Sequence, residues 1–197
     1  MPFVNAPEVI RPAVTTAPVS PTLLDTLLPR YDHRTMQGRA VKAPLETVIA
    51  AIRETPLDDA KLARTLMAVR TLGRSWRRER IAIADMGDGA TGFVPIGSSA
   101  EEIVVGFAGR PWPGGDAMDL DADEWRALEP IDCVKVGMSV RATIASYGTL
   151  LITETRILCG PDARTPFDRY WLFVRPGSDI VRGSLLRAIA RHAERAA

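Results

Sequence analysis

The sequence predicts an α+β fold in which a curved antiparallel sheet packs against a long C-terminal helix. Residues 133–159 contain two strand-like runs on either side of a tight turn at 147–148. Residues 165–196 then form an aromatic and later aliphatic helical segment that ends the chain. One strand and two short helices precede the remaining strands, which is an α+β order rather than an alternating one. We expect a single domain at 23–197 behind a proline-rich arm at 1–22.

The composition is that of an ordinary globular protein. Of the 197 residues, 46% are hydrophobic and 25% charged, and the net charge is +1. So balanced a charge gives no global field to attract nucleic acid or an anionic membrane. The N-terminus has no signal-peptide pattern, and no apolar run reaches the roughly 18 residues of a membrane helix. We therefore expect a cytoplasmic protein with no nucleic-acid partner and no membrane insertion, in which Cys133 and Cys159 are reduced thiols.

The first 22 residues are dense in proline. Pro2, Pro7, Pro12, Pro18 and Pro21 occur there, and proline removes a backbone donor and blocks helix formation. An extended arm is expected. Three roles stay open for it: a flexible tail, a strap on its own domain, or the contact of a homodimer.

The first half of the domain contains short helical segments and one strand. A helix is expected at 23–28 and a strand at 33–43. A second helix follows Pro44 and ends at Pro56, because its apolar positions recur at helical spacing. These positions are Leu45, Val48, Ile49 and Ile52. A third helix is expected at 58–72, with an apolar stripe of Leu62, Leu66 and Val69.

The middle of the chain predicts loops and two sheet strands. The basic run at 74–80 is interpreted as a solvated connection, with phosphate or acidic-lipid contact as the alternative. Strands are expected at 93–96 and 102–108. Trp112 lies in a Gly- and Pro-rich loop that either covers a pocket mouth or is a plain connection. A short helix at 121–128 should bury Trp125.

The predicted hairpin leaves the orientation of one charged pair open. Residues 134–144 alternate apolar and polar side chains, so we expect one buried and one solvated face. A two-residue turn at 147–148 would place Glu154 and Arg156 on the face of Arg141, toward solvent. A three-residue loop would shift the register by one and turn both inward.

The C-terminal segment predicts a helix interrupted near its middle. Phe167, Tyr170, Trp171 and Val174 share one face. Pro176-Gly177 then predicts a break or kink. A second apolar stripe follows at 181–189.

This order of elements resembles the helix-grip domains of the SRPBCC superfamily, which includes START-like and birch-pollen-allergen-like proteins. The likeness to uncharacterised bacterial members covers roughly residues 25–195. It is carried by Thr153-Glu154-Thr155-Arg156, Tyr170-Trp171 and Val181-Arg182. The resemblance implies a sheet wrapped around the terminal helix and a largely apolar cavity between them. Its members bind lipids, hormones or polyketides, or act as cyclases or hydrolases.

Residues with catalytic chemistry are few. His33 and His192 are the imidazoles of the chain, and His33 cannot easily pair with the adjacent Asp32, because neighbouring strand residues face opposite sides. No sequence motif indicates a metal, a nucleotide or a nucleophilic serine, so no cofactor is expected. The candidate ligand-binding residues are Glu154, Arg156, Tyr170, Trp171, Trp112 and Met138.

Three functions stay open at this point. The first is non-catalytic binding of a small apolar or amphipathic molecule in a cavity between sheet and helix. The second is a polyketide cyclase or aromatase in which Glu154, Arg156 or Tyr170 acts on a substrate in that cavity. The third is an interaction protein whose core is filled by tryptophans and whose contact is the arm or the basic terminal helix.

Overall fold

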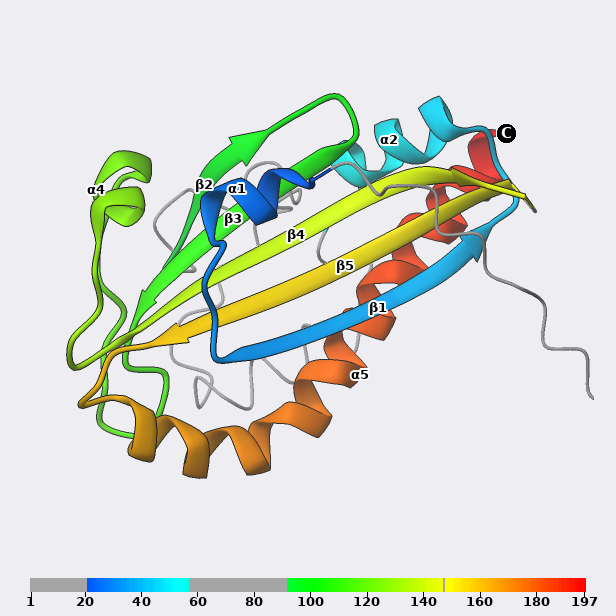
Figure 1. Cartoon of the computed structure of the whole chain (residues 1–197). Coiled ribbons are helices and arrows are strands. Elements are labelled where there is room, and N and C mark those ends of the chain that lie inside the picture. The colour runs from blue at the N-terminus through cyan, green and yellow to red at the C-terminus, as the bar shows by residue number, and fades with distance from the viewer. Residues whose placement is uncertain (1–20, 57–91, 147) are drawn as a thin grey trace, which may run out of the picture.

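The computed structural model describes residues 21–56, 92–146 and 148–197. In these residues, an antiparallel sheet has the strand order β1-β5-β4-β3-β2 (Figure 1). The strands are β1 (His33–Val41), β2 (Phe93–Ser98), β3 (Glu102–Gly109), β4 (Val134–Ala145) and β5 (Gly148–Cys159). The helices are α1 (Leu23–Leu27), α2 (Leu45–Glu54), α4 (Ala122–Ala127) and α5 (Arg164–Ala196). The predicted α+β class is confirmed.

Helices pack on both faces of the sheet. α5 and α2 cover one face, called here the α5 side, while α1 and α4 cover the other, called the α1 side (Figure 1). On the α5 side, Val140 and Leu151 join Leu185 and Ile189 in one apolar core. On the α1 side, α1, α4 and the β2–β3 strands form a second core, in which Trp125 is fully buried as predicted.

The β4–β5 hairpin has a register different from both predicted ones. Ala145 pairs with Gly148, and Glu154 pairs with Ser139. Glu154 and Arg156 therefore share a face with Arg141, as the two-residue turn predicted. The expectation that this face is solvated was wrong, because Glu154 and Arg156 are 1% and 5% exposed there.

Close packing of α1 explains why the second face of β4 is dry. A Cβ at Gly137 would lie 2.8 Å from Leu24 Cδ1, so glycine at this position leaves room for the Leu24 side chain against β4. α1 itself begins at a capping box in which Thr22 and Asp25 exchange hydrogen bonds. The short helix at 23–28 was predicted, but its position over β4 was not.

α5 continues through Pro176 as one helix of 33 residues that curves along its length (Figure 1), so of the predicted break or kink the break was wrong. Proline removes one helical hydrogen bond and crowds the preceding turn. Packing on both sides of it holds the helix together. Phe167 is buried in the N-terminal half, and Leu185 and Ile189 are buried in the C-terminal half.

Several predictions fall outside the described residues. They concern the arm up to residue 20, the helix at 58–72, the basic run at 74–80 and the turn residue 147. Within the described ranges, no helix combines the length and apolar character needed to cross a bilayer.

Candidate functional site

The candidate ligand-binding residues lie on opposite sides of the sheet. Tyr170, Trp171 and Trp112 meet on the α5 side, where they pack against a cluster containing Phe167. Met138 is half-buried on the same side, against the neighbouring core. Glu154 and Arg156 face the α1 side, so the structure does not bring the six residues into one site.

Glu154 is the centre of a buried ionic network. Its Oε1 accepts hydrogen bonds from Arg34 Nε and Arg156 Nε, both at 2.8 Å. Arg156 also donates to Asp25 of α1 and, at 3.2 Å, to the Leu28 carbonyl oxygen. The network thus ties α1 and β1 to β5, which lies more than 100 residues later in the chain.

The protonation of the network follows from its pairing. Burial acts to raise the pKa of Glu154, but hydrogen bonds from Arg34 and Arg156 outweigh it and lower that pKa. Burial also acts to raise the pKa of Asp25. Hydrogen bonds from the Thr22 backbone and from Arg156 outweigh this effect and lower that pKa to about 2. Both groups are therefore carboxylates that accept hydrogen bonds, which is a poor starting point for a general base.

An aromatic cluster surrounds His33 at one end of the α5 side. The Phe167 and Trp171 rings stack with centroids 5.7 Å apart, and the His33 ring lies 5.3 Å from Phe167. His33 Nε2 is 2.9 Å from Asp168 Oδ1. Sequence reasoning missed Asp168, because 135 residues separate the two and only the path of α5 unites them.

Asp32 and the cysteines do not complete a nucleophilic site with His33. Asp32 accepts hydrogen bonds from the Cys159 backbone N–H and the Arg164 guanidinium. Burial raises the pKa of the Cys159 thiol to about 12 and also raises that of Cys133. Both cysteines are free and buried, as predicted, and neither is activated toward attack.

The inner side of α5 carries one buried cation. Arg182 is 3% exposed and lies one turn before Leu185 and Leu186, which pack on the sheet. Its guanidinium donates to Asp179 and, at 3.1 Å, to Ser178 Oγ, while Nε has no partner. Gln37 of β1 reaches this turn by donating to the Asp179 carbonyl oxygen at 3.0 Å.

Two hydroxyls on the sheet lie near this polar turn. Thr35 and Thr155 are cross-strand neighbours, and both Oγ1 atoms are buried without a hydrogen-bond partner. Thr35 shares the face of Gln37, two residues further along β1. Met138 pairs with Thr155 in the next strand. Polar and apolar groups thus face α5 side by side.

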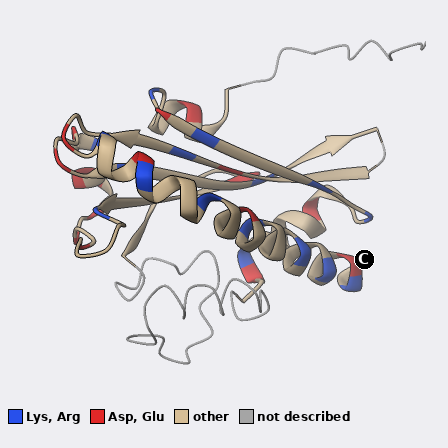
Figure 2. Cartoon of the chain, turned by 90° about the horizontal axis from the view of Figure 1, so that it is seen from below, with Lys and Arg blue, Asp and Glu red and all other residues tan. Residues whose placement is uncertain are grey.

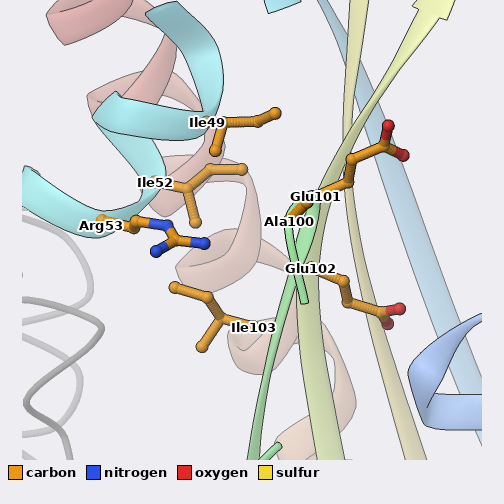
Figure 3. Close-up of a pocket in the computed structure, with 7 residues that line it drawn as sticks. All are labelled: Ile49, Ile52, Arg53, Ala100, Glu101, Glu102 and Ile103. Atoms are coloured by element: carbon orange, nitrogen blue, oxygen red, sulfur yellow. The ribbon is translucent and has the colours of Figure 1, made fainter. Parts of the chain in front are cut away.

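Two hollows of the described residues are lined by none of the six candidate ligand-binding residues. Figure 3 shows one between α2 and β3, where Ile49, Ile52 and Ile103 leave no room for a water molecule. Glu102 points away from them, and its Oε2 accepts from the Leu23 backbone N–H at 2.7 Å. The second is an open groove of about 510 Å³ beside the β4–β5 turn.

The outer side of α5 exposes large apolar side chains. Leu172 and Phe173 are 76% and 85% exposed, and Ile180 is 48% exposed. Sequence reasoning assigned buried faces to this segment and did not single out these residues. We call them, together with the exposed Arg169, Arg187 and Arg191, the α5 stripe.

Comparisons with known proteins identify no family. No protein-family model and no curated protein matches the chain. A crystal structure of a Mesorhizobium loti protein is 13% identical, with a TM-score of 0.38, and covers 81% of this chain and 98% of that one. One from Chromobacterium violaceum is 14% identical, with a TM-score of 0.34, and covers 83% and 99%. At these scores neither supports an inference, and the SRPBCC resemblance stays a prediction.

Proposed function

We propose that this protein is a non-catalytic interaction protein that binds a partner through the outer side of α5. The observation that carries the proposal is the exposure of Leu172 and Phe173 in the middle of an ordered helix. Large exposed apolar groups gathered in one place mark interaction sites more often than chance exposure does. Fully burying two such side chains contributes roughly 3–6 kcal/mol, enough to dominate a specific contact.

The inner side of α5 already accounts for the stability of the helix. Phe167, Leu185 and Ile189 are at most 5% exposed and anchor it on the sheet. Leu172 and Phe173 add nothing to that packing, so folding does not explain their apolar character. Binding does.

The cyclase hypothesis loses its main support. Glu154 and Arg156 that face the cavity, without hydrogen bonds to each other, would favour it. The sheet separates these two residues from Tyr170, and Glu154 accepts hydrogen bonds from two arginines. We therefore propose an interaction role rather than catalysis.

A second candidate is the binding of a small amphipathic molecule between the sheet and α5. The observations that favour it are the buried Arg182, whose Nε lacks a partner, and the unpartnered hydroxyls of Thr35 and Thr155 on the sheet. Such groups suit an anionic or polar head, and Met138 with the aromatic cluster suits an apolar tail. Native mass spectrometry of wild type and Arg182→Met tests it. An adduct present only in wild type supports this candidate, and no adduct in either argues against it.

The interaction role is tested with matched surface variants. Leu172→Ser/Phe173→Ser removes the apolar centre of the α5 stripe. Ile131→Ser/Ile144→Ser is the control, because these side chains are 64% and 75% exposed and do not belong to α5. Proteins retained from an extract are quantified, purified and titrated against each variant. We expect at least one to bind wild type and control alike and to lose tenfold or more in affinity for the stripe variant.

Equal retention of every protein by both variants would contradict the interaction role at this surface. Circular dichroism and urea unfolding of each variant first establish that it is folded. Because the mutated side chains are exposed, we expect both variants to be within about 0.5 kcal/mol of wild type.

A further inference from the structure

We propose that the partner of the α5 stripe is an acidic amphipathic helix of another protein, with an apolar centre and carboxylates toward both ends. This inference rests on the interaction role proposed above. It is carried by the order of charged and apolar side chains along the exposed line of α5.

Five residues of the α5 stripe lie along one line of the helix, and Leu172 lies beside that line. Phe173, Ile180, Arg187 and Arg191 follow Arg169 by 4, 11, 18 and 22 residues. These steps are close to whole multiples of the 3.6-residue turn, so the side chains project in nearly one direction. From Arg169 to Arg191 the line is about 33 Å long. That length is sufficient for a helix of about six turns to lie along it.

The charges of the α5 stripe are of one sign and are not neutralised. Arg169, Arg187 and Arg191 form no ion pair with any acid among the described residues. Other arginines of α5 do: Arg164 pairs with Asp32, and Arg182 with Asp179. Arg segments recur along α5 toward the C-terminus, with fewer Asp and Glu segments between them (Figure 2). The unpaired guanidiniums are available to carboxylates of a partner.

The same charges argue against a second copy of this chain. Two α5 helices packed antiparallel about Ser178, midway between the two arginines, would bring Arg169 of each close to Arg187 of the other. Like charges placed opposite one another across an interface are unfavourable. A partner with carboxylates toward both ends removes this repulsion and supplies opposite charge at each arginine. Its apolar centre would cover Leu172, Phe173 and Ile180.

Two synthetic peptides test the charge requirement on the full-length protein. Both are 22-residue amphipathic helices with a central Leu and Phe seam. One carries Glu toward both ends and the other carries Lys. Fluorescence anisotropy should give at least tenfold tighter binding of the Glu peptide at 50 mM NaCl. That difference should shrink at 500 mM NaCl, because salt screens exposed charges.

A charge exchange makes the test specific to the α5 stripe. Arg187→Glu/Arg191→Glu should weaken the Glu peptide tenfold and strengthen the Lys peptide. The control, Arg30→Glu/Arg110→Glu, makes the same change in net charge at arginines paired with Glu129 and Asp132. It should leave both affinities within about twofold of wild type. Equal binding of the two peptides, or an equal effect of the control, overturns the inference.

Other occupants give distinct results. A dimer in light scattering that Leu172→Ser/Phe173→Ser abolishes would assign this surface to a second copy. Co-sedimentation with phosphatidylglycerol vesicles, without peptide binding, would assign it to an anionic bilayer. Either result overturns the acidic-helix inference. A partner that depends on Leu172 and Phe173 but lacks acidic residues overturns this inference and leaves the interaction role standing.

Discussion

Replacing Glu154 by leucine should destabilise the protein by about 3–5 kcal/mol. The side chain of Glu154 is 2% exposed and accepts a hydrogen bond from Arg34 and from Arg156, each at 2.8 Å. Each charged hydrogen bond contributes roughly 1.5–3 kcal/mol, and breaking a buried pair costs about 3–5 kcal/mol. The loss has this size because the buried guanidinium of Arg156 keeps Asp25 but loses the carboxylate that accepts from its Nε.

Urea unfolding followed by tryptophan fluorescence measures the loss. With an m-value of about 2.5 kcal/mol/M, the midpoint should fall by roughly 1–2 M urea. Arg34 offers an internal comparison. Its side chain is 43% exposed, so solvent replaces part of its interaction and Arg34→Met should cost about 1 kcal/mol.

The double variant Glu154→Leu/Arg156→Met separates an ionic network from simple packing. Removing both charges leaves no buried guanidinium without its partner, so it should be at least as stable as Glu154→Leu. A midpoint shift below about 0.3 M for Glu154→Leu would refute the reasoning. So would a double variant whose loss equals the sum of the two single losses.

Three further perturbations have defined outcomes. Asp25 has a folded pKa of about 2, lowered from 3.8; its contribution to stability is therefore present above pH 3.8 and lost as the pH falls toward 2. Asp25→Asn should lose that part of the stability–pH profile, and an unchanged profile would contradict the pairing with Arg156. Cys133 and Cys159 should react with Ellman's reagent at pH 8 only as fast as the protein unfolds, because burial raises the pKa of both thiols. Rapid reaction before guanidinium is added would contradict this. Lys135→Met should destabilise by about 1–3 kcal/mol in urea, since Lys135 Nζ donates to the Arg126 and Leu128 carbonyl oxygens at 2.9 Å; a loss below about 0.5 kcal/mol would be inconsistent with these bonds.

Local patterns were sufficient to predict most elements of the described fold. Alternation in residues 134–144 predicted β4, and helical spacing from Leu45 to Ile52 predicted α2. Proline predicted a helix end, as at Pro56, which follows α2 and its C-cap Thr55. These signals are short-range, so a single sequence is enough to detect them.

Burial of the second face of the sheet could not be predicted in this way. Lys135, Ser139 and Arg141 look like the solvated side of an amphipathic strand, and alternation gives no sign of a helix above them. α1 lies there because Gly137 admits Leu24, over a hundred residues earlier in the chain. Lys135 finds hydrogen-bond partners at α4, whereas Ser139 Oγ and Arg141 Nε are buried there without one.

The candidate site failed for the same reason, and α5 shows it most clearly. Periodicity correctly assigned Phe167 to a buried face, yet it could not say that the next exposed turn would present Leu172 and Phe173 together. A side chain that the fold requires is covered by the fold, as Phe167 is at 2% exposure. Phe173, six residues later, is 85% exposed, and replacing it should change stability little. If the matched serine variants confirm that folding does not need it, the selective value of a phenylalanine at this position lies in what it contacts outside the chain. The network around Glu154 links α1 to the sheet, and we propose that the outer side of α5 is where the protein meets its partner.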